Sequence, residues 1–171
     1  MKEPNKLMVV AHPDDEIFFG GDELIQEKGW KVICISDRND ATRKKEFETV
    51  MKQVEVTDYE IWSYRDAWTE HVNRPKLEAD LRRVLAEREY KKIVTHNLKG
   101  EYGHPEHKAL SEIMYNLVDE NLYMFDFTIK KLLFVDILKR KLEILELYKS
   151  QKPAVIELLD LIAIARTIKI K

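Results

Sequence analysis

The chain places three carboxylates directly after a short apolar run near its start. Residues 8–11 are apolar and lead into His12-Pro13-Asp14-Asp15-Glu16. An ionised carboxylate beside a buried strand loses its hydration, so this cluster is unfavourable unless a cation or a reaction needs it. The stretch therefore predicts a buried strand that ends at a functional site, which the rest of the chain must complete.

Composition narrows the class of protein. The 171 residues fit one domain, expected to span 1–171, and 44% hydrophobic with 35% charged residues is typical of a soluble globular chain. With 29 basic and 31 acidic residues, no strong field favours nucleic acid or an anionic membrane. No apolar run is long enough to span a membrane, and the apolar start is too short for a secretory signal, so we expect a cytoplasmic protein. The single cysteine, Cys34, predicts a buried reduced thiol.

Short apolar runs alternate with helical patterns along the chain. We expect strands at 6–11, 31–36, 59–63, 92–95 and 128–135. We expect helices at 16–28, 41–55, 76–89, 105–120, 139–150 and 153–166. This alternation predicts an α/β fold, a Rossmann-like and mostly parallel sheet of about five strands with helices on both faces. Gly20-Gly21, early in the first helical pattern, indicates a close approach of the backbone to a neighbour or ligand.

A second polar motif follows the fourth predicted strand as the first motif follows the first strand. His104 and His107 flank Pro105, so they are neighbours on the first turn of a helix. Sites in parallel sheets form outside the carboxyl ends of the strands, where both motifs fall. Across the turn stiffened by Pro13, His12 and Asp15 can face one point.

Two imidazoles and one carboxylate with an open fourth position are the pattern of a catalytic zinc site. Asp15 with one histidine from each motif satisfies this count, and spacing alone leaves the choice of histidine open. Either motif alone is more often a helix cap or surface decoration, but their joint occurrence after two strands favours a metal site. We interpret His96 as a satisfied loop histidine and His71 as a surface residue.

Both motifs resemble those of a known family, the PIG-L/LmbE-like zinc-dependent de-N-acetylases of the N-acetylglucosaminyl deacetylase superfamily. Residues 11–16 match its first signature, and residues 103–107 match its Gly-His-Pro-Asp-His form with Glu106 in place of aspartate. Arg43 and Glu46 resemble its Arg-x-x-Glu. Residues 141–151 look like its C-terminal Lys…Tyr-x-Ser-Gln helix.

This resemblance implies a Rossmann-like fold and removal of the acetyl group from an N-acetylglucosamine-type substrate. It implies that His12, Asp15 and His107 hold Zn²⁺, with Fe²⁺ or another divalent metal as an alternative. Asp14 is then the general base, and His104 is the electropositive or acid partner that stabilises the oxyanion. The metal would lower the pKa of a bound water towards roughly 7 and polarise the amide carbonyl.

Six further residues are expected behind or around this site. Asp66, after the third strand, is our candidate for the carboxylate behind His104. Arg43 is a candidate for binding sugar hydroxyls or a phosphate. Glu46 is likewise a candidate for binding the substrate or for supporting the site residues from behind. Aromatic surfaces on which a sugar could stack are offered by Trp62, Tyr64 and Trp68.

Three other functions remain open from the residues. One is a non-enzymatic metal- or sugar-binding protein of the same fold, and another is a hydrolase of a different N-acyl amide. The third is an iron(II) oxygenase with two histidines and one carboxylate, although those sites usually occur on an all-β barrel. The expected partner is a small amino-sugar conjugate without nucleic acid, and a homo-oligomer is compatible with the sequence. The substrate and its aglycone do not follow from it.

Overall fold

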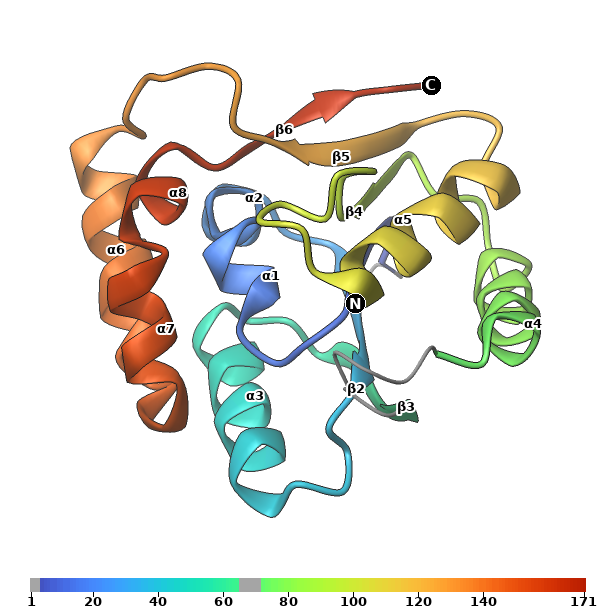
Figure 1. Ribbon diagram of the computed structural model, residues 1–171, viewed down its shortest axis with the longest axis horizontal. Coiled ribbons are helices and arrows are strands. Elements are labelled where there is room, and N and C mark those ends of the chain that lie inside the picture. Colours follow the sequence, from blue (N-terminus) through green and yellow to red (C-terminus); the bar gives the residue numbers. More distant parts are fainter. Residues whose placement is uncertain (1–3, 65–71) are drawn as a thin grey trace.

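The protein is described by a computed structural model that covers residues 4–64 and 72–171. The described residues form a six-stranded sheet in the order β3-β2-β1-β4-β5-β6 (Figure 1). The strands are β1 (Lys6–Val10), β2 (Trp30–Ser36), β3 (Asp58–Tyr64), β4 (Lys92–Thr95), β5 (Leu122–Asp126) and β6 (Arg166–Lys169). All neighbours pair in parallel except β5 and β6, which are antiparallel. The predicted mostly parallel α/β sheet is confirmed, with one strand more than the five expected.

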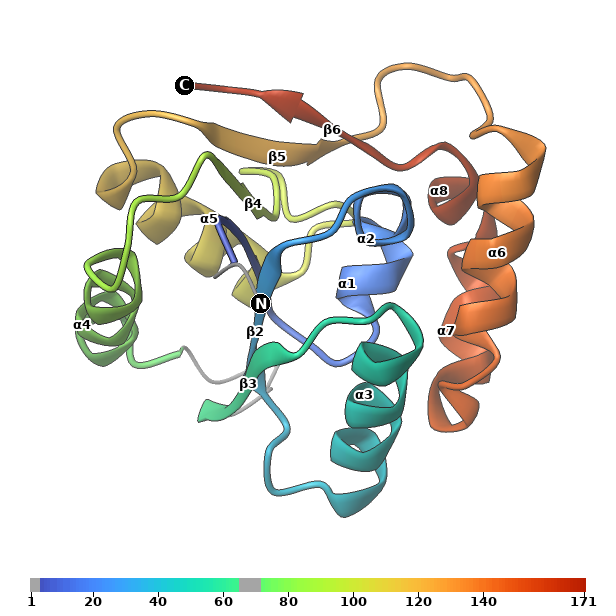
Figure 2. The ribbon, with the colours of Figure 1, turned by 180° about the vertical axis from the view of Figure 1, so that it is seen from behind.

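Helices cover both faces of this sheet (Figures 1 and 2). One face carries α4 (Arg74–Leu85) and α5 (Pro105–Leu117). The other carries α1 (Asp15–Phe18), α2 (Gly21–Gln26), α3 (Ala41–Gln53), α6 (Val135–Leu145), the 3₁₀ helix η1 (Lys149–Gln151), α7 (Lys152–Glu157) and α8 (Leu159–Ile164). Across residues 4–64 and 72–171, we find no helix with the length and apolarity needed to cross a membrane.

The core lies in two layers, one on each side of β1. Met8 and Val10 belong to the layer under α1, α3 and α6, whereas Leu7 and Val9 belong to the layer under α4 and α5. Side chains alternate along a strand, so a parallel strand covered on both faces must be apolar throughout. Cys34 lies in the first layer as a buried free thiol, as predicted. The burial of β1 on both faces holds the polar residues that follow it at the carboxyl edge of the sheet.

The predicted helix at 16–28 is divided in two, because the chain approaches β1 closely at Gly20. A Cβ atom on Gly20 would lie 2.5 Å from Cε of Met8, which no side chain could tolerate without a shift. The sequence prediction of a close backbone approach at Gly20-Gly21 is therefore confirmed. The break leaves α1 as a short helix that begins within the first motif, at Asp15.

The prediction of a strand at 128–135 is wrong. Strand β5 lies earlier, at 122–126, where Ile93 of β4 pairs with Leu122. The apolar residues Leu132 and Phe134 of the predicted strand are instead 63% and 77% exposed. Both segments have the composition of a strand, but only the earlier one reaches the edge of β4.

The C-terminal helical predictions also need correction. The expected helix at 139–150 begins at Val135 and ends at Leu145, before η1. The expected helix at 153–166 is the pair α7 and α8, and residues 166–169 form β6. Strand β6 pairs with β5 and so covers a sheet edge whose backbone groups a longer helix would leave unpaired.

Candidate functional site

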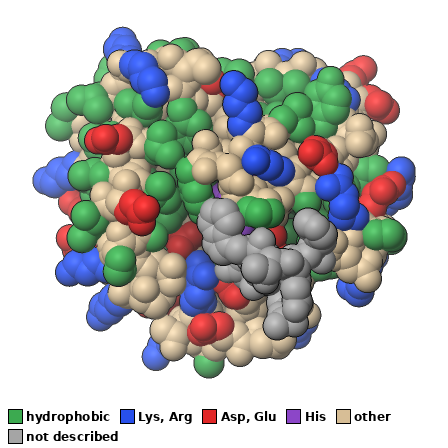
Figure 3. All heavy atoms as spheres, in the orientation of Figure 1, with side chains coloured by type: hydrophobic (Ala, Val, Ile, Leu, Met, Phe, Trp, Pro, Cys, Tyr) green, Lys and Arg blue, Asp and Glu red, His purple; other side chains and the backbone are tan. Residues whose placement is uncertain are grey.

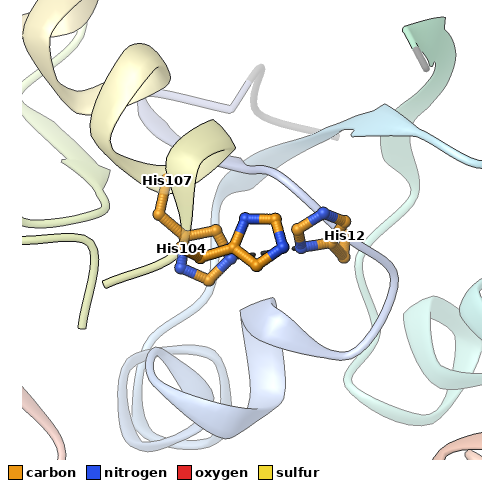
Figure 4. Close-up of side chains that lie close together, drawn as sticks. All are labelled: His12, His104 and His107. Carbon is orange, nitrogen blue, oxygen red and sulfur yellow. Dashed lines mark hydrogen bonds between the residues drawn. The ribbon is translucent and has the colours of Figure 1, made fainter. Parts of the chain in front are cut away.

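The two polar motifs meet at the carboxyl ends of β1 and β4. These strands are neighbours in the sheet, with Met8 paired to Val94. Figure 4 shows the three imidazoles of the motifs turned toward one another, with His12 on the loop after β1 and the other two at the start of α5. Pro105 is the first residue of α5. His104 is the N-cap and His107 lies in the first turn, so the two histidines are close together. The structure therefore brings together the residues that the sequence predicted would meet.

Three ligand-type atoms form a nearly equilateral triangle at this point. His12 Nδ1 lies 3.2 Å from Asp15 Oδ2 and 3.1 Å from His107 Nε2, and His107 Nε2 lies 3.2 Å from Asp15 Oδ2. Ligands about 2.0–2.1 Å from a tetrahedral zinc ion stand roughly 3.3 Å apart. The dimensions of the triangle therefore fit a small divalent cation.

A carboxylate stands behind each imidazole of the triangle. His12 Nε2 lies 3.0 Å from Glu106 Oε2, and His107 Nδ1 lies 2.6 Å from Glu101 Oε2. Metal-binding histidines usually donate their second ring N–H to a carboxylate or carbonyl in this way, which fixes the tautomer and the ring orientation. Each ring is thus held with its other nitrogen directed at the triangle.

His104 has a different hydrogen-bonding role from the other two histidines. Its Nδ1 accepts the backbone N–H of Glu106 at 3.3 Å, which makes it the N-cap of α5. Its ring meets that of His12 edge-on, with the centroids 4.6 Å apart. Ligand-type atoms of His12, His104 and His107 all lie within 4.8 Å of one another, so distance alone does not exclude His104. The hydrogen bond to Nδ1 sets it apart from the triangle.

His96 is buried directly after β4 and is hydrogen-bonded at both ring nitrogens. Its Nε2 accepts the backbone N–H of Ala11 at 3.0 Å, and its Nδ1 lies 2.9 Å from Glu101 Oε2. These contacts agree with the interpretation of His96 as a satisfied histidine. The same Nε2 nevertheless lies only 3.5 Å from Asp15 Oδ2, so this ring is part of the cluster.

Asp14 lies beside the triangle in a strained backbone conformation. Its φ is 124°, a value that a residue with a side chain rarely adopts and that costs about 1–3 kcal/mol. The backbone N–H of Asp14 donates to Glu16 Oε2, and the Asp14 carboxylate accepts from Arg43 Nη2 at 3.1 Å. The bond from Arg43 holds the Asp14 side chain in place beside the triangle.

The adjacent aspartates have pKa values displaced in opposite directions. Burial, reinforced by the charge of Asp15, raises the pKa of Asp14 well above its ordinary value even though Arg43 opposes the shift. Burial would also raise the pKa of Asp15, but His107, His12 and His96 outweigh it and hold that pKa well below the usual range. Paired carboxyls whose environments separate their pKa values are suited to different roles. The environment of Asp15 favours its ionised form, whereas that of Asp14 favours uptake of a proton.

Arg43 and Glu46 have partners within the protein. Arg43 donates to the carbonyl of Pro13 at 2.8 Å and contacts Asp37 Oδ2 at 2.7 Å, in addition to Asp14. Glu46 accepts the backbone N–H of Ser150 at 3.0 Å and its hydroxyl at 2.5 Å, which joins α3 to η1. Arg43 therefore supports the first motif, and Glu46 connects the two segments whose sequences resemble Arg-x-x-Glu and Tyr-x-Ser-Gln.

A pocket of about 170 Å³ opens over the site. Its polar side holds His12, Asp14, Asp15, Arg43 and His104, and its remaining lining is Phe18, Tyr102, Gln151, Ala154 and Leu158. In Figure 3 only a small area of histidine shows near the middle of this face, with apolar side chains gathered over α6–α8. The C-terminal segment therefore supplies part of the pocket wall, including the glutamine of its motif.

Two of the predicted aromatic residues lie away from this pocket. Trp62 and Tyr64 line a separate cavity of about 580 Å³ between β3 and α4. The side chain of Trp62 donates to Glu60, so it does not provide the expected stacking surface over the site. The candidates Asp66, Trp68 and His71 lie outside the described residues.

The carboxylates behind the rings, Glu101 and Glu106, were not predicted from the sequence. Burial would raise the pKa of Glu101, but His96 and His107 outweigh it and lower that pKa to about 2. The neighbouring Gly100, at φ 68°, has no room for a side chain because a Cβ would lie 2.7 Å from the carbonyl oxygen of His104. A carboxylate between two glycines just before the second motif was the available signal.

Glu16 is a further buried carboxylate of the first motif, and burial raises its pKa to about 7. It accepts the hydroxyl of Tyr148 as well as the backbone N–H of Asp14. Glu16 thus connects the first motif to the C-terminal segment.

Solved structures share this fold. The conserved protein TT1542 from Thermus thermophilus has a TM-score of 0.71 and 16% identity, covering 96% of this chain and 94% of that one. A deacetylase of the teicoplanin biosynthesis pathway has a TM-score of 0.67 and 14% identity, covering 88% and 86%. GalB, the 4-carboxy-2-hydroxymuconate hydratase from Pseudomonas putida, has a TM-score of 0.60 and 18% identity, covering 95% and 83%. A hydratase and a deacetylase thus share one fold, so the fold alone does not decide the reaction.

Sequence comparison is more specific. An uncharacterized protein of Acanthamoeba polyphaga mimivirus is 40% identical over 138 residues, which cover 71% of this chain. The match spans 61% of the length of that relative. Residues 7–118 match the PIG-L family, described as GlcNAc-PI de-N-acetylase, and this range includes both motifs. The chain belongs to the PIG-L family.

Proposed function

We propose that this protein is a metal-dependent hydrolase that removes the N-acetyl group from an N-acetylglucosamine-type conjugate. The family description supports a de-N-acetylase, and a deacetylase shares the fold. The observation that carries the proposal is the triangle of His12, Asp15 and His107, with side lengths of 3.1–3.2 Å, beside an aspartate whose pKa is raised.

The three atoms of the triangle would hold the ion. Two imidazoles and one carboxylate suit Zn²⁺ and also Fe²⁺. When bound, a divalent ion supplies Lewis acidity, which polarises the amide carbonyl and makes water more acidic. Glu101 and Glu106 keep the two ligand rings oriented for this task.

Asp14 is the proposed proton carrier. Its carboxylate lines the pocket, and Arg43 holds one carboxylate oxygen in place. As a water oxygen forms a bond to the acetamide carbon, Asp14 takes the water proton. It then delivers this proton to the sugar nitrogen as the C–N bond breaks, leaving acetate and a free amine. The raised pKa of Asp14 makes its carboxylate a stronger base than an exposed aspartate.

His104 is the proposed donor to the oxyanion of the tetrahedral intermediate. Its Nδ1 accepts a backbone N–H, so in a neutral ring the proton resides on Nε2. Such a ring carries an N–H donor and lines the pocket. This arrangement differs from that of His12 and His107, whose second nitrogens face carboxylates.

The proposal is tested by measuring acetate release from a panel of N-acetylglucosamine conjugates and other N-acyl amides, with Zn²⁺- and Fe²⁺-loaded protein. We expect acetate release from at least one acetamido sugar. The Asp14→Asn variant should retain the metal and lose activity by a factor on the order of 10² or more, because only the proton carrier is removed.

Turnover of a different N-acyl amide alone would replace the proposed substrate class. A metal-loaded protein that turns over nothing in the panel would instead favour a binding protein. Wild-type rates in Asp14→Asn would contradict the role given to Asp14.

A further inference from the structure

Glu101 lies under two histidine rings in the loop between β4 and α5. Its side chain is fully buried. Oε2 lies 2.9 Å from His96 Nδ1 and 2.6 Å from His107 Nδ1, and Oε1 accepts the backbone N–H of Asn97 at 2.8 Å. One carboxylate therefore contacts two rings and the backbone at once.

The two rings compete for one position beside Asp15. They are stacked, with their centroids 3.8 Å apart and an interplanar angle of 23°. Their Nε2 atoms lie 3.2 Å (His107) and 3.5 Å (His96) from Asp15 Oδ2. On distance from the aspartate alone, either imidazole could serve as its partner ligand.

Hydrogen bonds separate the two rings. A carboxylate only accepts, so Glu101 favours the proton on Nδ1 of both rings and leaves a lone pair on each Nε2. The Nε2 lone pair of His96 already accepts the backbone N–H of Ala11 at 3.0 Å. The Nε2 of His107 is directed at His12 Nδ1 and Asp15 Oδ2.

We propose that Glu101 is a positioning residue that sets the tautomers of both rings, so that His107 binds the metal while His96 holds the backbone. This inference rests on the metal site of the proposed function. It assigns to one side chain both the orientation of a ligand and the exclusion of its stacked neighbour.

The backbone around Glu101 is shaped to bring this carboxylate under the rings. Glu101 has φ 55° and follows Gly100 at φ 68°, so two successive residues are left-handed. This conformation is disfavoured for a residue with a Cβ. The tight loop that results places a buried anion where a longer and relaxed loop would leave it in solvent.

The decisive variant is Glu101→Gln, which keeps the shape and replaces one acceptor oxygen with an amide donor. If the amide nitrogen takes the place of Oε2, it faces two ring N–H groups, and if it takes the place of Oε1, it faces the N–H of Asn97. Either orientation sets the amide donor against another donor. Glu112→Gln, an exposed change on α5, is the matched control.

The first measurement is the tautomer of His96 and His107 in the metal-free protein, from the ¹⁵N chemical shifts of their rings. We expect both wild-type rings to be protonated on Nδ1, and at least one to change tautomer in Glu101→Gln. The second measurement is affinity for Zn²⁺ and Co²⁺ by competition with a chromophoric chelator. We expect Glu101→Gln to bind about 10- to 100-fold more weakly, with an altered Co²⁺ absorption spectrum. Glu112→Gln should match the wild type in both.

Unchanged tautomers and an affinity within about twofold of wild type in Glu101→Gln would overturn the inference, because the expected loss is about tenfold or more. If Glu101→Gln does not fold, Glu101→Asp decides, since it keeps the carboxylate but is too short to reach both rings. It should then protect the Nδ1 tautomer of one ring only, and unchanged tautomers and affinity would overturn the inference. A wild-type protein that binds no metal would refute the proposed function, whereas the tautomers of the metal-free protein would still test Glu101.

Discussion

Two regions of this molecule bury charged groups in opposite ways. At the candidate metal site, each histidine of the triangle has a carboxylate behind its ring, and Asp15 is surrounded by imidazoles. Between α2, α6 and α8, by contrast, Lys141 is fully buried and donates to the carbonyl of Ile162, while Asp22 has a buried oxygen with no hydrogen-bond partner among the described residues. Both regions bury ionisable side chains, but only in the first does a carboxylate, Asp15, have several imidazoles as partners.

The pKa values follow this difference. Burial lowers the pKa of Lys141 from 10.5 to about 8 and raises that of Asp22 from 3.8 to about 6, so both groups shift toward neutrality. The pKa of Asp15 shifts the other way, because the imidazoles outweigh burial. Burial thus shifts a carboxyl group toward its neutral form unless opposing partners outweigh burial, as the imidazoles around Asp15 do.

The largest effect is expected for Asp15→Asn, which removes the charge at the centre of the triangle. We expect affinity for Zn²⁺ to fall by more than about 10²-fold, the upper end expected for a residue that only supports a ligand. The same chemical change in the other region, Asp22→Asn, should leave affinity unchanged. Competition titration with a chelator measures both variants, and equal affinities for them would erase the distinction between the regions.

The next effect concerns Lys141 and the pH dependence of stability. Its folded pKa of about 8 lies below the unfolded value of 10.5, so the unfolded chain binds more protons between these values. Its contribution is therefore fully present above pH 10.5 and lost as pH falls through 8. The shift corresponds to about 3 kcal/mol. In the wild type, the free energy of unfolding measured in urea should therefore rise between about pH 8 and 10.5, and in Lys141→Met this rise should be absent. A pH dependence of the variant parallel to that of the wild type would contradict the assignment.

The smallest effect is expected for Ser150→Ala, which removes an exposed partner of Glu46. Exposed hydrogen bonds contribute little, so the free energy of unfolding should fall by about 0.5–1 kcal/mol. Because Glu46 does not line the pocket, KM for an acetamido sugar should not change. A large rise in KM would show that this hydroxyl supports the pocket, through Glu46 or through the Gln151 side chain that donates to it.

The sequence predicts those parts of the structure that local composition determines. The segments β1 and β4 are short apolar runs ended by polar or proline-containing loops, so local chemistry marks them. Both motifs directly follow parallel strands, so the sequence also predicts that they meet at the carboxyl edge of the sheet. The roles of His12, Asp15 and His107 came from family resemblance, and the side lengths of the triangle agree with them.

Long-range partners could not be predicted. The choice of 122–126 over 128–135 as a strand depends on pairing with β4, which composition does not record. Likewise, Glu101 gains its meaning from the stacking of His96 on His107, and Lys141 from the packing of α6 against α2 and α8. In each case the deciding contact joins residues that the sequence separates.

The central claim is that His12, Asp15 and His107 together hold a divalent cation. Anomalous diffraction from crystals grown with Zn²⁺ tests it most directly. We predict one strong peak about 2.0–2.1 Å from His12 Nδ1, Asp15 Oδ2 and His107 Nε2, with His104 uncoordinated. A peak that includes His104 or His96 in place of one of these atoms, or no peak at this site, would contradict the account.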